Sequence, residues 1–188
     1  MIARISLILT GLAIMFALPV VAMLTQNHPY HGLMIEEKAP EFHLAHLDSK
    51  TSTLNDYQDK PVYMSFGYTH CTHTCPIQLN ALQKLQEKVG DQAHFLWISL
   101  DPEGDNQEAL AALEKTGMTV LLPASKKAAK QLAQAYKNNV SYKKGELDYI
   151  QHNSHIYLIN NNELIMLYKG STVKSEQLAS DFQQLFII

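Results

Sequence analysis

The sequence predicts an α/β fold in which helices flank a central mixed sheet. Strand candidates alternate with helix candidates along the chain, as in proteins of this class. Residues 93–100 are almost all apolar, which is typical of a strand buried on both faces of a sheet. The chain has two cysteines, Cys71 and Cys75, which follow a β-rich run and precede a helical pattern. We therefore expect both thiols at a turn between a strand and a helix.

The elements around the cysteines follow from local patterns. Residues 42–45 are a short strand candidate, and residues 46–49 have the composition of a turn. Residues 61–66 predict a central strand that leads to the cysteines. Apolar residues at helical spacing predict a helix over residues 77–89, and Gly90 is its expected end.

The rest of the chain continues the alternation and then forms hairpins. The elements expected after the strand at 93–100 are a loop at 101–105, a helix at 106–115, a strand at 120–122 and a helix at 125–136. Two hairpins follow, with strands at 140–142 and 148–151 and then at 154–160 and 163–169, before a last helix at 175–186. Because a cysteine pair stands after an early strand and at the head of a helix, the predicted architecture is thioredoxin-like.

The N-terminus predicts a membrane anchor. Residues 5–24 carry no charge, and a run of about 20 apolar residues is long enough to span a bilayer. Arg4 precedes this run and is expected on the cytoplasmic side, which places the rest of the chain on the extracytoplasmic side. Cleavage of a signal peptide after Ala22 is the alternative, and it leads to the same compartment. The expected organisation is an anchor at 1–24, a polar linker at 25–38 and one domain at 39–188.

Composition narrows the function. The chain has 15 basic and 18 acidic residues and a formal net charge of −3, so it has no basic surface of the kind that binds nucleic acid. Two cysteines cannot form a structural disulfide framework, and their spacing favours one functional pair. At the positive end of a helix the thiolate form is favoured, which is the form that attacks disulfides and binds soft metals.

The spacing of the cysteines leaves two kinds of chemistry open. Redox disulfides of this fold more often have two intervening residues, whereas the three between Cys71 and Cys75 suit a metal chelate at least as well. Two thiolates suit Cu(I) or zinc, and a histidine would complete such a site. The sequence offers His70 and His73 beside the cysteines, and His152 and His155 where a hairpin enters a strand.

Three separated stretches resemble the SCO/SenC family of thioredoxin-like copper proteins, which serve cytochrome c oxidase assembly. The matching stretches are residues 66–71 with Cys75 and Pro76, residues 97–103 and residues 149–159, in the family's order and over most of 39–186. The family's ligand histidine maps to His152 rather than His155. The resemblance implies that Cys71, Cys75 and His152 are the copper ligands, for Cu(I), Cu(II) or both.

The resemblance also implies a function and a location. It indicates a metallochaperone, which is a binding and transfer protein, that delivers copper to the copper centre of cytochrome c oxidase subunit II; thiol–disulfide oxidoreductase activity stays open. We expect it to be anchored with its domain in the periplasm, and the absence of an Arg-rich amphipathic presequence favours a bacterial inner membrane over the mitochondrial one. The main alternative is a thiol–disulfide oxidoreductase that keeps a partner's cysteines reduced. Its redox-active disulfide would join Cys71 and Cys75, and His152 would have no role. A peroxide-reducing or sensory domain is a third reading.

The chain departs from the family pattern at three places. Thr72 and His73 stand where the family usually has Pro-Asp, Gly104 stands where it often has Arg, and Gln151 replaces the Asp before the ligand histidine. Replacing an acid with His73 removes a negative charge and should lower the pKa of the cysteines. All three implied ligands are kept, so we expect these changes to alter the copper affinity and the redox potential rather than to abolish metal binding.

Overall fold

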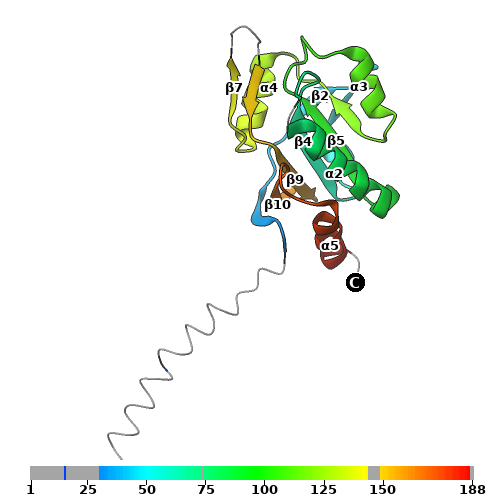
Figure 1. Ribbon diagram of the computed structural model, residues 1–188, viewed down its shortest axis with the longest axis vertical. Helices are drawn as coiled ribbons and strands as arrows, with labels where there is room; N and C mark the ends of the chain where they lie inside the picture. The colour runs from blue at the N-terminus through cyan, green and yellow to red at the C-terminus, as the bar shows by residue number, and fades with distance from the viewer. Residues whose placement is uncertain (1–14, 16–29, 73, 144–148, 187–188) are drawn as a thin grey trace, which may run out of the picture.

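The computed structural model describes residues 15, 30–72, 74–143 and 149–186 (Figure 1). Its strands are β1 (Leu33–Lys38), β2 (His43–Ala45), β3 (Thr51–Thr53), β4 (Val62–Gly67), β5 (His94–Ser99), β6 (Thr119–Leu121), β7 (Val140–Lys143), β8 (Tyr149–His152), β9 (His155–Asn160) and β10 (Glu163–Lys169). Its helices are α2 (Thr74–Val89), α3 (Gln107–Glu114), α4 (Lys126–Ala135) and α5 (Ser175–Phe186), and the 3₁₀ turns are η1 (Leu54–Tyr57) and η2 (Gly90–Gln92).

Within these residues the main sheet has six strands in the order β1–β10–β9–β4–β5–β6. β4, β5 and β6 are parallel, whereas β9, β10 and β1 are added in antiparallel pairs. β2 pairs with β3 and β7 pairs with β8 in separate two-stranded ribbons. The mixed sheet with a strand-to-helix cysteine junction confirms the predicted α/β, thioredoxin-like arrangement.

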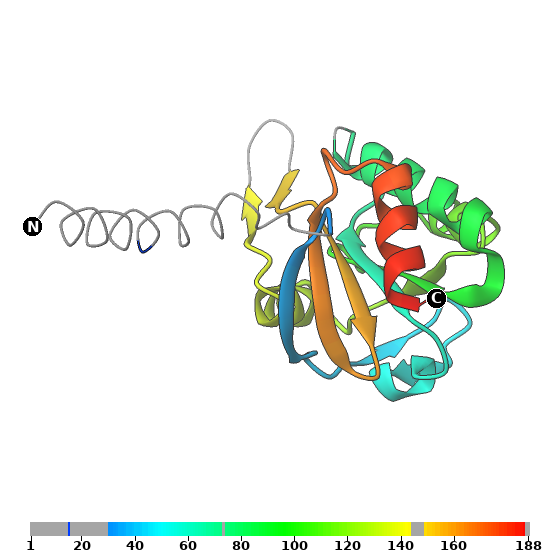
Figure 2. The ribbon, with the colours of Figure 1, turned by 90° about the horizontal axis from the view of Figure 1, so that it is seen from below.

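The sheet separates two hydrophobic cores. Because successive residues of a strand point to opposite faces, Tyr63 and Met64 of β4 enter different cores. On one face Tyr63 packs with Leu82 of α2 and Phe182 of α5. On the other face, aromatic residues of the sheet pack against Tyr136 at the end of α4. Figure 2 shows α5 and α2 on one side of the sheet and α4 on the other. Every residue of β4 is buried, since this strand lies in the centre.

The helix after the cysteines begins earlier than its apolar period predicts. α2 starts at Thr74 instead of residue 77, so Cys75 and Pro76 belong to its first turn. A proline is accepted there because the first amide groups of a helix have no partner within the helix. The two late hairpins are found as predicted, although the tip of the first, residues 144–148, lies outside the described residues.

One expectation about the N-terminal part is wrong. Residues 33–38 are predicted to belong to the polar linker, but they form the edge strand β1, which pairs with β10. The strand is mostly exposed, and its register shifts between Met34 and Glu37, where Glu36 has a φ of 53°. The strand is held by backbone pairing with β10 and buries few side chains, so its sequence shows no apolar period. The short strand β3 and the turn η1 are further elements without such a signal.

The predicted anchor is not described by the structure. Among the described residues, no helix is both long enough and apolar enough to cross a bilayer. Apart from Met15, the segment at 1–24 and the linker residues up to 29 lie outside that part of the chain. The anchor and the signal-peptide alternative stay predictions.

Candidate metal centre

A short loop carries the first cysteine from β4 to α2. The Cys71 N–H donates to the Tyr68 carbonyl at 3.2 Å, which closes a turn after the strand. The Cys71 sulfur then accepts the backbone N–H of Cys75 at 3.4 Å, and the Thr74 hydroxyl lies 3.8 Å from the same sulfur. Cys71 therefore satisfies one of the free amides at the start of α2, as an N-cap side chain does. Both thiols lie at the positive end of the helix, as predicted.

His152 reaches the cysteines from the end of β8. Its Nδ1 lies 3.0 Å from the carbonyl oxygen of Asn153, and its Nε2 lies 3.7 Å from the Cys75 sulfur. Because a carbonyl only accepts, Nδ1 carries the proton in the neutral ring and Nε2 presents its lone pair to the sulfur. The edge of the imidazole packs against the ring of Tyr68, with centroids 6.0 Å apart.

The three side chains form a compact donor set. One Sγ of each cysteine and one ring nitrogen of His152 all lie within 4.8 Å of one another. In the described part of the chain, no other three His, Cys, Asp or Glu side chains come together in this way. Cys75 is buried, whereas Cys71 and His152 are partly exposed. Two sulfurs and an imidazole without a carboxylate fit a soft ion such as Cu(I), or zinc, rather than Mg²⁺ or Ca²⁺.

The two thiols have different proton affinities. A hydrogen bond from the Cys75 thiol lowers the pKa of Cys71, and the Cys75 amide and the Thr74 hydroxyl act in the same direction. The negative charge that results on Cys71, together with burial, raises the pKa of Cys75. These opposite shifts favour the thiolate on Cys71 and the proton on Cys75. A cation that bound Cys75 would have to displace that proton.

The other candidate histidines do not join this group where the structure describes them. His70 is exposed, and its Nδ1 lies 3.4 Å from the Thr69 hydroxyl. His155 lies against Tyr157, whose hydroxyl is 3.4 Å from its Nδ1, and burial lowers the pKa of its ring. His73 lies outside the described residues. The geometry therefore favours His152 over His70 and His155, and ligation by Cys71, Cys75 and His152 stays a prediction.

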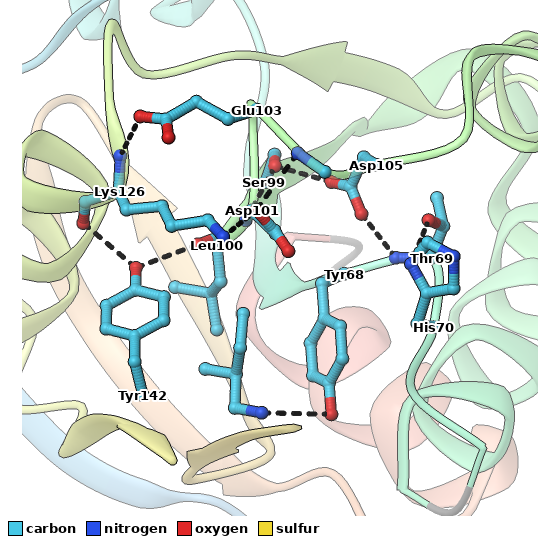
Figure 3. Close-up of polar contacts among 12 residues, drawn as sticks. Tyr68, Thr69, His70, Ser99, Leu100, Asp101, Glu103, Asp105, Lys126 and Tyr142 are labelled. Carbon is cyan, nitrogen blue, oxygen red and sulfur yellow. Dashed lines mark hydrogen bonds and ion pairs between the residues drawn. The ribbon is translucent and has the colours of Figure 1, made fainter. Parts of the chain in front are cut away.

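A buried carboxylate holds the cysteine loop against β5. Asp105 accepts the Thr69 N–H at 2.6 Å with one oxygen and the Ser99 hydroxyl at 2.5 Å with the other (Figure 3). The Thr69 hydroxyl in turn accepts the N–H of Asn106 at 2.9 Å. Because Thr69 is two residues before Cys71, these bonds fix the start of the loop that presents the first sulfur.

The loop after β5, which contains Asp101, Pro102 and Glu103, is bound to α4 and β7. The Lys126 ammonium lies 3.0 Å from Asp101, and its backbone N–H donates to Glu103 at 3.3 Å (Figure 3). The Tyr142 hydroxyl lies 2.8 Å and 2.9 Å from the carbonyl oxygens of Leu100 and Lys126. Where the family often has Arg, the N–H of Gly104 donates to Asp101 at 3.0 Å.

Gln151 is exposed on β8 and pairs with Ser141 of β7. It therefore does not replace the missing acid as a partner of His152. The backbone carbonyl of Asn153 serves as the acceptor for Nδ1. A carbonyl is among the usual partners of ligand histidines, and it fixes the ring without adding charge.

Comparison with known proteins identifies the family. The SCO1/SenC family model matches residues 34–186. The chain belongs to the SCO1/SenC family. This SCO1/SenC chain is 30% identical to the human mitochondrial protein SCO2 homolog over 155 residues, which is 77% of this chain and 58% of the human protein. It is 32% identical to the mitochondrial protein SCO1 homolog 2 of Arabidopsis thaliana over 151 residues, or 74% of this chain and 54% of that protein. It thus spans about half the length of the curated relatives it matches.

Solved structures of similar fold agree with this membership. A SCO1/SenC family lipoprotein from Bacillus anthracis gives a TM-score of 0.70 at 23% identity, covering 81% of this chain and 96% of that one. The Arabidopsis thaliana ScoI structure with copper bound gives a TM-score of 0.68 at 22% identity, covering 78% and 96% of the two chains. At these identities the likeness shows the fold, which agrees with the thioredoxin-like prediction. The resemblance noted in the sequence is confirmed.

Tyr68 is a further residue of this candidate site that was not predicted from the sequence. Its ring packs on His152 and its hydroxyl accepts the N–H of Ile150 at 3.4 Å. It therefore joins the cysteine loop to the hairpin that carries the histidine. Its place inside the matched stretch 66–71 was the available signal.

Proposed function

We propose that this protein is a copper metallochaperone that delivers copper to the copper centre of cytochrome c oxidase subunit II during assembly of the enzyme. The observation that carries the proposal is the meeting of Cys71, Cys75 and His152 within 4.8 Å. The histidine is 77 residues from Cys75 in sequence, so this meeting requires the whole fold. The match to the SCO1/SenC family supports copper as the ion.

The residues of the site have separate roles in this proposal. The Cys71 thiolate and the Nε2 lone pair of His152 are available before the ion arrives, and Cys75 gives up its proton as copper binds. Copper is the cargo, held by two soft sulfurs and one imidazole. Because Cys71 and His152 are partly exposed, the ligands of an acceptor can approach the ion from that side, while the buried Cys75 retains it until transfer.

Solved structures of related proteins support a copper role. Proteins of Arabidopsis thaliana, Bradyrhizobium japonicum and yeast are described with copper bound. The BsSco protein is described as having a disulfide switch and as a member of a family of cytochrome c oxidase assembly proteins. These related proteins support the proposal that this chain binds copper and acts in cytochrome c oxidase assembly.

A thiol–disulfide oxidoreductase is the second candidate function. It is favoured by a partly exposed Cys71 whose pKa is lowered, because such a thiolate can attack a disulfide of a partner. Cys75 would then displace the partner and form a disulfide with Cys71. This chemistry needs no histidine ligand, which makes His152 the residue that separates the two functions.

His152→Ala provides the test. We expect copper affinity, titrated against a competing chelator, to fall by at least about 100-fold, since loss of even an outer partner of a ligand costs 10–100-fold. Formation of the Cys71–Cys75 disulfide should be retained. His155→Ala is the matched control because it removes a half-buried histidine three residues away, and it should leave affinity near that of the parent. His73→Ala should do the same.

Two outcomes would reject parts of this proposal. If His155→Ala or His73→Ala loses copper while His152→Ala does not, the ligand assignment is wrong. If no histidine matters for copper while the disulfide still cycles, the oxidoreductase function takes its place.

We further propose that residues 1–24 anchor the domain on the periplasmic side of a bacterial inner membrane. The support is the uncharged run after Arg4. The linker would then end before β1, at about residue 32. The full chain should fractionate with membranes, and protease added from the periplasmic side should digest the domain. Recovery of the intact chain in the cytosol would contradict this placement.

A further inference from the structure

A buried asparagine lies behind the histidine of the metal centre. Asn138 has a relative exposure of 0% and stands between α4 and β7. The end of α4 fixes its backbone: Lys137 adopts a φ of 57°, and the Asn138 N–H donates to the Ala133 carbonyl at 2.8 Å. With the 2.9 Å bond from Lys137 to Gln134, this is a Schellman C-cap. The side chain of Asn138 therefore starts from a rigid point of the fold.

Both ends of this side chain bind the same residue. The Asn138 Nδ2 donates to the Asn153 carbonyl at 2.9 Å, and the Asn138 Oδ1 accepts the Asn153 N–H at 2.9 Å. The β7–β8 ladder ends at the pair Val140 and His152, one step before Asn153. The amide side chain thus supplies the next rung, where the backbones no longer pair.

The same carbonyl also holds the imidazole. The Asn153 oxygen accepts from Asn138 Nδ2 and lies 3.0 Å from His152 Nδ1, so its two lone pairs are both used. The result is a continuous chain of hydrogen bonds from the cap of α4 to the ring whose Nε2 faces the Cys75 sulfur at 3.7 Å.

We propose that Asn138 is a positioning residue of the metal centre: it fixes the Asn153 peptide, whose carbonyl holds His152 with Nδ1 protonated and Nε2 directed at the cysteines. The part of this inference that concerns copper rests on the proposed function. The part that concerns the ring does not, because it rests only on the hydrogen bonds among Asn138, Asn153 and His152. The Nδ2 and Oδ1 of Asn138 both bond to the Asn153 peptide, through which Asn138 acts on His152.

The test compares Asn138→Ala and Asn138→Asp with Gln78→Ala. Asp keeps the shape and the acceptor for the Asn153 N–H but removes the donor to its carbonyl. Gln78 is the matched control: it is also a buried amide, and its Nε2 donates to the His155 carbonyl at 2.6 Å, three residues past His152. It therefore reports the cost of losing a buried amide near the hairpin without touching the Asn153 peptide.

The first readout needs no metal. The ring nitrogens of His152 in the reduced, metal-free protein are assigned by ¹⁵N NMR at a pH where the ring is neutral. We expect the parent and Gln78→Ala to show the Nδ1-protonated tautomer, and both Asn138 variants to show a mixture of tautomers. The Asp variant keeps the result decisive if the Ala variant does not fold.

The second readout is copper affinity against a competing chelator. Both Asn138 variants should bind about 10–100-fold more weakly than the parent, the usual range for an outer partner of a ligand, while still forming the Cys71–Cys75 disulfide. Unchanged tautomer and affinity in both variants, or equal effects in Gln78→Ala, would overturn the inference. If the parent itself binds no copper, the proposed function fails, and the tautomer measurement alone decides the role of Asn138.

Discussion

At the scale of single residues, buried polar side chains hold backbone groups around the candidate metal centre. Asp105, 8% exposed, accepts the Thr69 amide in front of Cys71, and Asn138 holds the Asn153 peptide behind His152. Burial raises the pKa of Asp105, although the bonds from Ser99 and Thr69 oppose this rise. The geometry of the cysteine loop thus depends on a carboxylate whose ionised form is disfavoured by burial.

Asp105→Asn should change how stability depends on pH. The pKa of Asp105 is higher in the folded chain than in the unfolded chain, where it is about 3.9. Between these values the folded state binds more protons, so the contribution of Asp105 is fully present below about pH 3.9 and is lost as pH rises through the folded pKa. Asparagine does not titrate, so the variant does not lose this stability as pH rises. In urea denaturation, the difference in unfolding free energy between variant and parent should shift in favour of the variant from about pH 4 to about pH 7. A constant difference, or a shift the other way, would contradict the raised pKa.

At the scale of elements, the junction of β4 and α2 sets the position of the sulfurs. Gly67 ends β4, and its carbonyl accepts the Leu100 N–H at 2.7 Å, which extends the pairing with β5 to the edge of the site. Trp97 of β5 is 2% exposed and lies beside it. A Cβ on Gly67 would come within 2.7 Å of the indole nitrogen, so the close approach of the two strands requires a glycine here.

Gly67→Ala should therefore destabilise the protein. Overpacking a rigid buried ring typically costs about 1–3 kcal/mol, and we expect a loss of that size in chemical denaturation. The double variant Gly67→Ala with Trp97→Phe is the control, because the smaller ring leaves room for the methyl group. A double-mutant cycle should show that the alanine costs less in the Phe background. Equal costs in the two backgrounds would mean that the clash with the indole is not the cause.

At the scale of the whole molecule, one carboxylate joins the two ends of the described domain. Asp181 of α5 is completely buried and accepts the backbone N–H groups of His31, at 2.9 Å, and Gly32, at 3.2 Å. The Nδ1 of His31 lies 2.8 Å from the same carboxylate. These contacts fix the chain immediately before β1. The junction between the proposed linker and the domain is therefore part of the packed structure.

Asp181→Ala should loosen this end of the sheet. Leaving buried donors without a partner costs about 1–3 kcal/mol, and the loss should appear as faster hydrogen exchange of the β1 amides with little change in β4. His31→Ala removes only the side-chain contact and keeps both backbone bonds, so its effect should be clearly smaller. Equal effects of the two variants would assign the stabilisation to the imidazole instead.

Local patterns in the sequence predict the central elements and the cysteine pair. β4, β5, α2 and the late hairpins bury apolar side chains at a regular spacing, and Cys71 and Cys75 are close enough in sequence for their strand-to-helix position to be read directly. His152 was predicted through resemblance to a family, since nothing local separates it from His155. The edge strand β1 was missed, because it is held by backbone pairing with β10 and buries few apolar groups.

What remained open in the sequence was how distant polar groups meet. Asn138 and Asp105 are residue types common in loops, yet the fold buries them and directs each at one backbone segment of the candidate metal centre. Periodicity records which side chains face a core, and it carries no information on a hydrogen bond between residues 15 or 36 positions apart. The kind of chemistry follows from the cysteines and histidines in the chain. Which nitrogen of the neutral His152 ring carries the proton, and how its Nε2 comes to face the Cys75 sulfur, follow from packing, because the assembled sheet and the cap of α4 fix the Asn153 carbonyl.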